Sequence, residues 1–373
     1  MRPNPVIFST ILTASGHHFG RATLNAPASL NALSLEMVDL LSPQLAQWAS
    51  DPDIVGVVLD AAGDKAFCAG GDVVALYRAI KDAEPGTVPA GAARFFEREY
   101  RLDHRIHTYP KPLLCWGHGI VMGGGIGLLA GASHRVLTPK TRLAMPEITI
   151  GLYPDVGGSW FLGRAPGRVG AFLALTGAPL NASDACFAGL GDFVLNHADH
   201  GRVLKGLQAA EWSGDVMADA ARLSRLLGVC ARNVEPPFST LQAHLDRINA
   251  LIGHDALIDI APRLRALAND PDPWLAAAGS AFIKGSPTSA HLALEMQRRA
   301  RHLSLADVFR LEYQASVGCC LHADFAEGVR ALLVDKDKSP WWSPATLGDV
   351  SEAWIAEHIA SPAHGPQALA DLV

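Results

Sequence analysis

The glycine-rich segment VMGGGIGLLAGA, residues 121–132, constrains the fold of this chain of 373 residues more than any other feature. Glycine inside a regular element costs roughly 0.5–1 kcal/mol relative to alanine, so a run of glycines at the start of an apolar helical pattern needs a reason. The run follows a strand candidate at Lys111–Gly119 and opens a helix predicted over Gly124–Gly131. We therefore expect a strand-to-helix junction at which another group closely approaches the backbone.

Runs of β-branched and apolar residues alternate with helical patterns through the first half of the chain. Strands are predicted at Asp51–Gly63, Lys111–Gly119, His134–Pro139 and Thr141–Glu147, and helices at Leu35–Ser50, Gly124–Gly131 and Gly158–Leu175. This alternation is typical of the α/β class. Beyond residue 200 the patterns are almost all helical, with Ser286 or Thr288 as a possible helix cap. We predict an α/β core over residues 1–200 and a mainly helical region over residues 201–373.

The composition excludes several classes of partner. Hydrophobic residues make up 49% of the chain and charged residues 18%, and the formal net charge is -6. This balance supports a large core and argues against a nucleic-acid partner or an anionic membrane surface. No apolar run has membrane-spanning length, and the N-terminus lacks the apolar core of a signal peptide. The cysteines are scattered without a C-x-x-C pair, so we expect free thiols and a cytoplasmic location.

Three uses of the glycines remain open from the residues alone. They could permit close packing of a helix on a strand. Gly125-x-Gly127-x-x-Ala130, with Glu147 downstream, fits a dinucleotide-binding pattern, but GHGIVMG separates it from its strand. They could also present backbone N–H groups to an oxyanion, where one donor contributes roughly 3 kcal/mol in a transition state. A second such donor could come from KAFCAGGD, residues 65–72, near Gly71.

Several motifs resemble the crotonase, or enoyl-CoA hydratase/isomerase, superfamily. They are KAFCAGGDV, HGIVMGGGIGL, AMPEITIGLYPDVGGSWFL and the N-terminal LNAPASLNALSLEM. The later segments SPTSAHLAL and LEYQASVGCCLHADFAEGVRALLVDKDKSPWW are similar to the 3-hydroxyisobutyryl-CoA hydrolase branch. The resemblance covers nearly the whole chain. It implies a crotonase-like spiral of ββα units with a helical C-terminal region, and an acyl-CoA thioester as substrate.

The resemblance also implies an oxyanion hole, and it reveals one difference from the catalytic residues of the family's hydratases. It implies that the N–H groups of Gly71 and Gly124 hold the thioester carbonyl oxygen. Hydratases of the family place one glutamate three residues after the middle glycine, which is Gly127 here, and a second twenty residues later, which is Glu147. Because Gly127 has no side chain to act as acid or base, the sequence favours hydrolysis over hydration.

Four further residues are candidates, Asp155 and Glu99 of them by resemblance, and most have a simpler alternative. Asp155 in GLYPDVGGS is the acid that the hydrolase branch adds, although its position also suits a helix cap. Glu99 in FFEREY aligns with a substrate-contacting glutamate, although an exposed helix charge fits equally. Ala69 and Lys65 are expected to bind substrate, and Lys65 could meet a CoA phosphate or lie free at the surface.

The resulting hypothesis is hydrolysis of a short 3-hydroxyacyl-CoA, with 3-hydroxyisobutyryl-CoA expected first and 3-hydroxypropionyl-CoA as a fitting alternative. Glu147 either activates water or attacks the carbonyl to give a mixed anhydride. Asp155 holds the 3-hydroxyl or assists proton transfer to the thiolate. We expect no metal and no cofactor beyond the CoA of the substrate, a role in valine degradation, and a possible homo-oligomer. An enoyl-CoA hydratase/isomerase and a non-catalytic acyl-CoA-binding protein are the alternatives.

Overall fold

The structure is a computed structural model that describes residues 4–360 and 368–373. The chain forms two compact units, each assembled from separate segments. The first unit comprises Met1–Gly71, Leu102–Leu143 and Leu180–Ser239, and the second comprises Asp72–Arg101, Ala144–Pro179 and Thr240–Val373. The predicted division after residue 200 stays a prediction, since these units are defined by contacts and interleave along the chain.

A six-stranded sheet forms the centre of the first unit, in the order β1-β2-β3-β5-β7-β9. Its strands are Val6–Leu12, His18–Leu24, Ile54–Ala61, Leu113–Gly117, His134–Leu137 and Phe193–Val194. Strands β1 and β2 are antiparallel, and the other neighbours pair in parallel. The predicted strands at Asp51–Gly63, Lys111–Gly119 and His134–Pro139 are therefore confirmed as β3, β5 and β7. The N-terminal hairpin of β1 and β2 was not predicted.

A second, smaller sheet carries the glycine segments. Its strands β4 (Ala66–Cys68), β6 (Ile120–Met122) and β8 (Arg142–Ala144) lie in the order β4-β6-β8. Strands β4 and β6 run parallel, with Ala66 paired to Ile120 and Cys68 to Val121. Because parallel strands end at the same edge, the segments that leave β4 and β6 start side by side.

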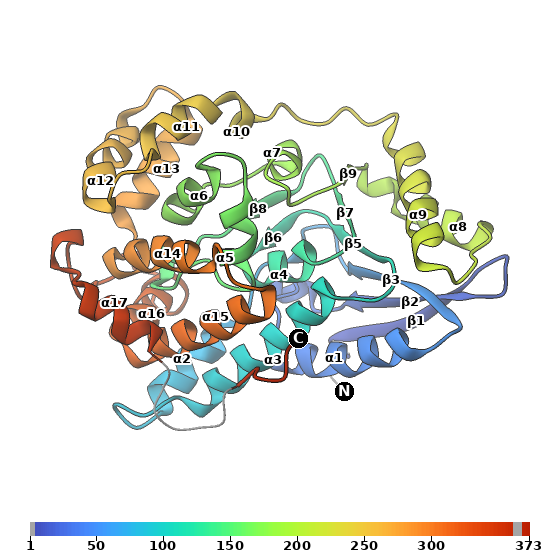
Figure 1. Cartoon of the computed structure of the whole chain (residues 1–373), viewed down its shortest axis with the longest axis horizontal. Coiled ribbons are helices and arrows are strands. Elements are labelled where there is room, and N and C mark those ends of the chain that lie inside the picture. Colours follow the sequence, from blue (N-terminus) through green and yellow to red (C-terminus); the bar gives the residue numbers. More distant parts are fainter. Residues whose placement is uncertain (1–3, 361–367) are drawn as a thin grey trace. The chain divides into compact units, whose positions relative to one another are not determined.

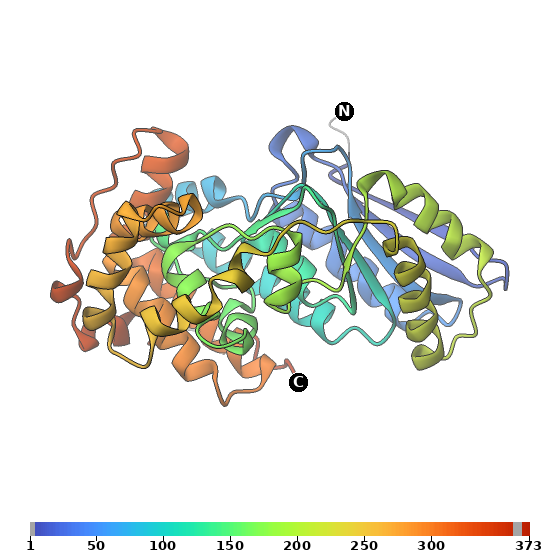
Figure 2. The same ribbon diagram turned by 90° about the horizontal axis from the view of Figure 1, so that it is seen from above.

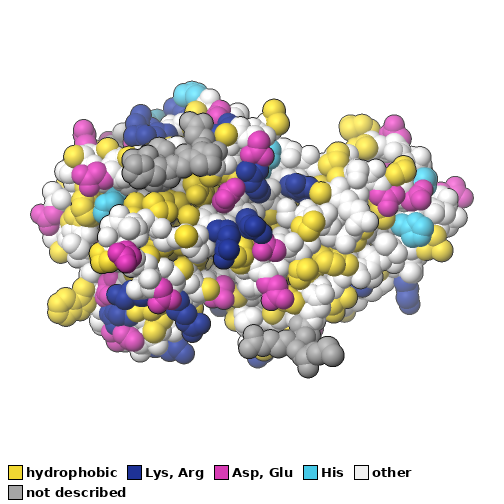
Figure 3. All heavy atoms as spheres, turned by 90° about the horizontal axis from the view of Figure 1, so that it is seen from below, with side chains coloured by type: hydrophobic (Ala, Val, Ile, Leu, Met, Phe, Trp, Pro, Cys, Tyr) yellow, Lys and Arg dark blue, Asp and Glu magenta, His cyan; other side chains and the backbone are white. Residues whose placement is uncertain are grey.

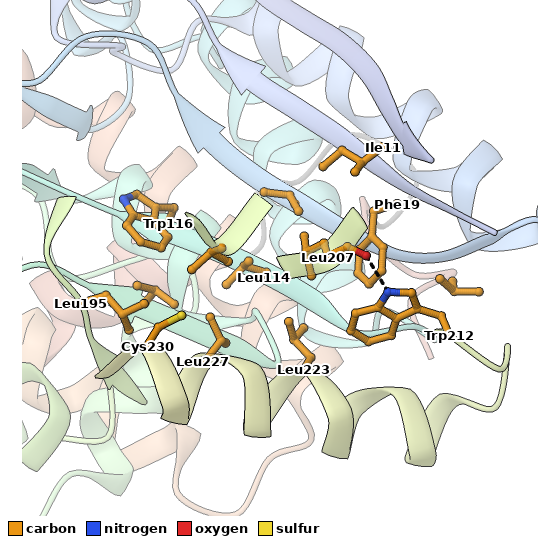
Figure 4. Close-up of a cluster of buried hydrophobic side chains, with 14 residues drawn as sticks. Ile11, Phe19, Leu114, Trp116, Leu195, Leu207, Trp212, Leu223, Leu227 and Cys230 are labelled. Carbon is orange, nitrogen blue, oxygen red and sulfur yellow. Dashed lines mark hydrogen bonds between the residues drawn. The ribbon is translucent and has the colours of Figure 1, made fainter. Parts of the chain in front are cut away.

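The last two helices of the first unit pack on the large sheet through a shared apolar cluster. The helices of the first unit include α1 (Leu35–Ser50), α4 (Gly124–Ala130), α7 (Ala182–Phe187), α8 (His200–Ala209) and α9 (Val216–Ala231). In Figures 1 and 2, α8 and α9 lie beside the strands of the large sheet. Figure 4 shows Leu223 and Leu227 of α9 pointing toward Leu114, and Trp212 beside Phe19. The indole N–H of Trp212 donates to the Leu207 carbonyl at 2.9 Å, so this buried polar group is satisfied.

The second unit is mainly helical. It contains α2 (Val73–Asp82), the part of α3 (Ala90–His107) up to Arg101, η2 (Glu147–Ile150), α5 (Gly158–Phe161), η3 (Leu162–Arg164) and α6 (Val169–Thr176). Its C-terminal part adds α10 (Thr240–Ala243), α11 (Leu245–Ile252), α12 (Leu257–Ala266), α13 (Pro273–Lys284), α14 (Pro287–Ala300), α15 (Leu305–Leu321), α16 (Ala323–Val329), a π-helical turn (Arg330–Val334) and α17 (Glu352–Ile359). Helices α14 and α15 lie side by side in Figure 1 and are in contact.

Two local predictions for this unit have clear outcomes. The single helix expected over Gly158–Leu175 is wrong, because α5, η3 and α6 are separated around Pro166 and Gly167. Proline removes a helical N–H, and Gly167 has a φ of 57°, a left-handed value that ends a helical path. Ser286, by contrast, is confirmed as a cap: it precedes α14, and its side chain accepts a hydrogen bond from the Ser289 amide.

The arrangement confirms the predicted α/β class, with a crotonase-like core and helical C-terminal region. Within the residues that the structure describes, no helix is both long enough and apolar enough to span a membrane. All six cysteines are free thiols. Figure 3 shows one face of the molecule, on which Lys and Arg side chains are interspersed with Asp and Glu side chains. Such mixing gives no broad field of one sign on this face.

Candidate active site

The two glycine segments of the first unit are in direct contact. A Cβ on Gly125 would lie 2.3 Å from the carbonyl oxygen of Cys68, a distance that no real side chain tolerates. On the other side, a Cβ on Gly70 would lie 3.3 Å from the carbonyl oxygen of Met122. The segment after β4 therefore packs backbone to backbone against the segment after β6. This close approach explains why the sequence has glycine at Gly125.

Gly124 and Gly71, the predicted donors of an oxyanion hole, lie on these two segments. Gly124 is the first residue of α4 and follows Gly123, whose φ of 47° is left-handed. The first N–H groups of a helix have no partner within that helix. Gly71 lies just after β4 and forms an isolated parallel bridge with Leu33. Both candidate donors thus come from the two touching segments.

Lys65 and Ala69 flank the strand β4 that leads to Gly71. Lys65 lines a cavity of about 390 Å³ between residues Pro27–Asn31 and Ala62–Ala66. The buried Asn31 side chain holds this cavity together, because it donates to the carbonyls of Ala62 and Ala66 at 3.0 and 2.9 Å. The Ala69 amide donates to the Leu30 carbonyl at 3.1 Å, so its N–H is occupied within the protein.

Three of the predicted carboxyl groups come together inside the second unit. Glu99 lies on α3, Glu147 begins η2, and Asp155 lies in the turn before α5. Only 2%, 4% and 5% of these residues, respectively, is exposed. An exposed helix charge is therefore the wrong interpretation of Glu99. A helix cap is the wrong interpretation of Asp155, since Gly157 occupies the cap of α5.

The electrostatics of this cluster oppose full ionisation. Burial, and then the charge of Asp155, raise the pKa of Glu147 well above its usual range. Burial and the charges of Asp155 and Glu147 raise the pKa of Glu99 in the same way. Burial raises the pKa of Asp155 to about 6. Neighbouring buried acids that interact this strongly titrate as a set, so ionisation of one of them disfavours ionisation of the others.

Two oxygens of the cluster are left for a ligand. Oε1 of Glu99 and Oε2 of Glu147 are buried and have no hydrogen-bond partner in the structure. A buried polar atom without a partner is costly, and it commonly marks a functional group. One Glu can donate a hydrogen bond while protonated, and another can accept a proton while ionised. The cluster therefore has the components for acid–base chemistry.

Sequence reasoning missed the groups that hold Asp155. The Tyr100 hydroxyl donates to Oδ2 of Asp155 at 2.6 Å. The carboxylate of Glu312, on α15, accepts hydrogen bonds from the amides of Gly157 and Ser159 at 2.7 and 2.9 Å. Tyr100 directly follows Glu99 in FFEREY, and Glu312 is an acid within an apolar helical pattern. A charge at a core position was the available signal.

Other candidate groups have structural roles or are absent. His118 contacts the Gly63 carbonyl at 2.7 Å, and His134 contacts the Ala220 carbonyl and the Ser224 hydroxyl, each at 3.0 Å. Among the described residues, no group of three or more His, Cys, Asp or Glu side chains is placed to hold a metal ion.

The class of protein follows from a comparison with family profiles. The sequence profile of the enoyl-CoA hydratase/isomerase family matches residues 19–359, and the chain belongs to this family. Individual relatives within this family have a more specific name. The mitochondrial 3-hydroxyisobutyryl-CoA hydrolase of Gallus gallus is 39% identical over 337 residues, which are 90% of this chain and 85% of the relative. The Homo sapiens protein of the same name is 37% identical over 342 residues, or 92% of this chain and 86% of the relative.

Two solved structures are similar over nearly the full length. A carnitinyl-CoA dehydratase from Mycobacterium thermoresistibile has a TM-score of 0.84 and is 37% identical, covering 96% of this chain and 97% of its own. An enoyl-CoA hydratase from Rhodobacter sphaeroides 2.4.1 has a TM-score of 0.83 and is 34% identical, covering 98% of this chain and 99% of its own. The shared fold includes the helical C-terminal part.

Proposed function

We propose that this protein hydrolyses a short 3-hydroxyacyl-CoA thioester, 3-hydroxyisobutyryl-CoA first, to the free acid and CoA. The hydrolase relatives support this reaction over most of the chain. The structural observation that carries the proposal is the buried set of Glu99, Glu147 and Asp155, combined with a glycine at Gly127. Hydration of a double bond in this family uses a carboxylate at that glycine position.

In the proposed reaction, the glycine segments bind the thioester carbonyl group that is attacked. The N–H groups of Gly71 and Gly124 would hold the thioester carbonyl oxygen as it gains charge. Each preorganised donor of this kind contributes roughly 3 kcal/mol to transition-state stabilisation.

Glu147 has two chemically distinct routes to hydrolysis. As a general base, it removes a proton from water that attacks the carbonyl carbon. As a nucleophile, it forms a mixed anhydride that water then opens. Rapid quenching of turnover with hydroxylamine separates them, because only the anhydride leaves a hydroxamate on Glu147, which mass spectrometry of the peptide detects.

Asp155 and Glu99 are proposed to recognise the 3-hydroxyl group of the acyl chain. Above a pH of about 6, Asp155 is largely ionised and accepts a hydrogen bond from that hydroxyl. Glu99, whose pKa is raised by burial and by the charges of Asp155 and Glu147, would donate a hydrogen bond to it in its protonated form. A site built for a hydroxyl discriminates strongly against an analogue without it, since its buried polar groups are then unpaired.

A panel of acyl-CoA esters tests the proposal directly. A thiol-reactive dye reports CoA release from the 3-hydroxyisobutyryl, 3-hydroxypropionyl, isobutyryl and crotonyl esters. We expect fast release from the two hydroxylated esters and release from isobutyryl-CoA that is slower by at least tenfold. Tight binding of the esters without thiol release would instead indicate an acyl-CoA-binding protein.

Hydration of an enoyl-CoA is the second candidate function. The names of the two similar structures, a dehydratase and a hydratase, favour it. The absorbance of the conjugated double bond in crotonyl-CoA separates the two activities, since hydration removes that absorbance without releasing a thiol. Loss of absorbance as the dominant reaction would overturn the hydrolase proposal.

The setting of the enzyme is part of the proposal. The only nucleotide in the proposed reaction is the CoA of the substrate, and we propose that no separate cofactor or metal takes part. The free cysteines support a cytoplasmic location, which cell fractionation tests, while the curated relatives are named as mitochondrial. We further propose a homo-oligomer and a role in valine degradation, to be checked by light scattering and by growth on valine.

A further inference from the structure

A chain of buried hydroxyl groups leads from Asp155 to helix α15. The Tyr100 hydroxyl donates to Asp155 at 2.6 Å and lies 2.7 Å from the Ser316 hydroxyl. The Ser316 hydroxyl lies 2.9 Å from the hydroxyl of Tyr153, which donates to the backbone carbonyl of Glu312 at 2.6 Å. Tyr100, Tyr153 and Ser316 are fully buried, so water does not provide their hydrogen bonds.

The number of hydrogen atoms in this chain depends on the state of Asp155. Four oxygen–oxygen contacts join Asp155, Tyr100, Ser316, Tyr153 and the carbonyl of Glu312. Three hydroxyl groups supply one hydrogen each, so an ionised Asp155 leaves one contact without a hydrogen. A protonated Asp155 adds the fourth, and every hydroxyl then points toward α15. The chain therefore accommodates both protonation states of Asp155 by rotation of the Tyr100 hydroxyl, while the Tyr153 hydroxyl donates to the Glu312 carbonyl in both states.

The same helix also holds the backbone beside Asp155. The carboxylate of Glu312 accepts the amides of Gly157 and Ser159, one on each oxygen. Between Asp155 and Gly157 lies Val156, whose φ of 52° is left-handed and unfavourable for a β-branched residue. Such backbone strain persists only where surrounding contacts fix it, and Glu312 provides two of them.

We propose that α15 is the positioning element for Asp155, acting on its side chain through Ser316 and Tyr100 and on its backbone through Glu312. This inference rests on the proposed function for the role of Asp155, but the contacts themselves do not depend on the substrate. Tyr100 is a positioning residue, since its hydroxyl contacts Asp155 and acts through it. The hydrogen bond from Tyr100 lowers the pKa of Asp155, which burial otherwise raises.

Several other titratable groups surround the Asp155 carboxyl, so the measurement must report the titration of Asp155 alone. They come from α3, η2, the turn before α5, and α15: Glu99, Tyr100, Glu147, Tyr153, Glu312 and Cys319. Carbon-13 NMR of protein labelled at the Asp carboxyl carbons resolves the titration of single residues. The signal that disappears in Asp155→Asn identifies Asp155 without any substrate.

The deciding variant is Tyr100→Phe, which removes only the hydroxyl that touches Asp155. We expect the Asp155 titration to move to higher pH by about one pH unit, because the ionised form loses a donor. Ser316→Ala, one contact further away, should move it in the same direction by less. Tyr109→Phe is the matched control, since the partly buried Tyr109 hydroxyl donates to the Leu45 carbonyl and not to a member of this network. It should leave the titration unchanged.

Kinetics then test the positioning role. If Tyr100 acts through Asp155, Tyr100→Phe should lower kcat/KM at least tenfold, whereas Tyr100→Phe added to Asp155→Asn should cause no further loss. A further loss of the same size in the double variant, or an Asp155 titration that does not move, would overturn the inference. If Tyr100→Phe does not fold by circular dichroism, Ser316→Ala decides by the same two measurements. Failure of the wild type to release thiol would overturn the proposed function alone, because the NMR titration still decides the positioning role.

Discussion

Gly125 packs against Cys68 so closely that a single methyl group on Gly125 would lie 2.3 Å from the carbonyl oxygen of Cys68. The obstacle is backbone, which cannot rotate away as a flexible side chain could. The contact therefore fixes the relation between the segment after β4, which carries Gly71, and the start of α4, which carries Gly124.

Gly125→Ala should therefore separate the two glycine segments and destabilise the protein. Overpacking of this kind typically costs 1–3 kcal/mol, and we expect a lower melting temperature and at least tenfold lower thioesterase activity. Gly201→Ala is the matched control, because nothing lies within 4 Å of a Cβ at Gly201 in helix α8. Alanine is the better helix former by about 1 kcal/mol, so the control should be neutral or slightly stabilising. Equal melting temperatures for the two variants would contradict the proposed contact.

Glu147→Gln should abolish hydrolysis while the protein still binds CoA esters. The amide keeps the shape of the side chain but neither accepts a proton efficiently nor attacks a carbonyl, so kcat should fall by about 10²–10⁴-fold. Calorimetry with a non-hydrolysable thioether analogue measures the binding. Glu97→Gln on α3 is the control, since Glu97 is partly exposed and its ion pair with Arg101 at 3.5 Å contributes little. Near-normal turnover by Glu147→Gln would remove Glu147 from the mechanism.

Asp155→Asn should change how stability depends on pH. Burial raises the pKa of folded Asp155 from 3.8 to about 6, so the folded protein binds this proton more tightly than the unfolded chain does. The corresponding stability is full below the unfolded pKa and is lost as pH rises through about 6. A pKa difference of about 2 corresponds to roughly 3 kcal/mol. The variant should therefore lose much of this decline in the unfolding free energy, measured by urea titration between about pH 4 and pH 7.

Asp60→Asn provides a control of the opposite sign for that experiment. Burial alone would raise the pKa of Asp60, but hydrogen bonds from His200 and Thr23, with the charge of Arg21, hold it below the usual value. Asp60 therefore stabilises the fold above the unfolded pKa, and this stability is lost as pH falls. Asp60→Asn should be less stable than the wild type at pH 7. If both Asn variants respond to pH in the same way, burial is not what governs Asp155.

Leu223→Ala should reveal how far the first unit depends on the cluster beneath α9. Leu223 is completely buried between this helix and the large sheet, and truncation of such a leucine costs about 2–5 kcal/mol. Met217 lies on the same helix but is 79% exposed, so Met217→Ala should change the unfolding free energy by less than about 0.5 kcal/mol. Chemical denaturation followed by tryptophan fluorescence measures both, and comparable losses would contradict the assigned packing.

The parts of the fold that sequence patterns predicted were those with strong local signals. The first helix was predicted at Leu35–Ser50, the residues that α1 occupies, and the structure adds that Ser34 caps it. The hairpin of β1 and β2 was missed. Much of β1 is exposed, including its apolar Ile7 and Leu12, so the strand lacks the regular alternation of apolar and polar residues that marks a half-buried strand. The predicted helix over Gly158–Leu175 was wrong because local turn chemistry at Pro166 and Gly167 overrode an apolar pattern.

For the candidate site too, the sequence predicted residues in local motifs but not the contacts between distant segments. The glycine segments and the acids Glu147 and Asp155 were found by resemblance, because they lie in short contiguous motifs. Tyr100 and Glu312 were not found, since 55 residues separate Tyr100 from Asp155 and 155 separate Glu312 from Gly157. Which buried hydroxyl meets which carboxyl is decided by packing, and no spacing rule in one sequence records it.

Asn31 has a consequence for the way in which the cavity beside Lys65 would bind a ligand. Its amide group accepts from the Ala26 N–H at 2.8 Å and donates to two carbonyls on the opposite wall, although its own φ of 54° is unfavourable. One side chain thus braces both walls before anything enters. A ligand bound here would meet a cavity that already has its final shape. The protein would then lose little conformational entropy on binding, which favours fast and tight association.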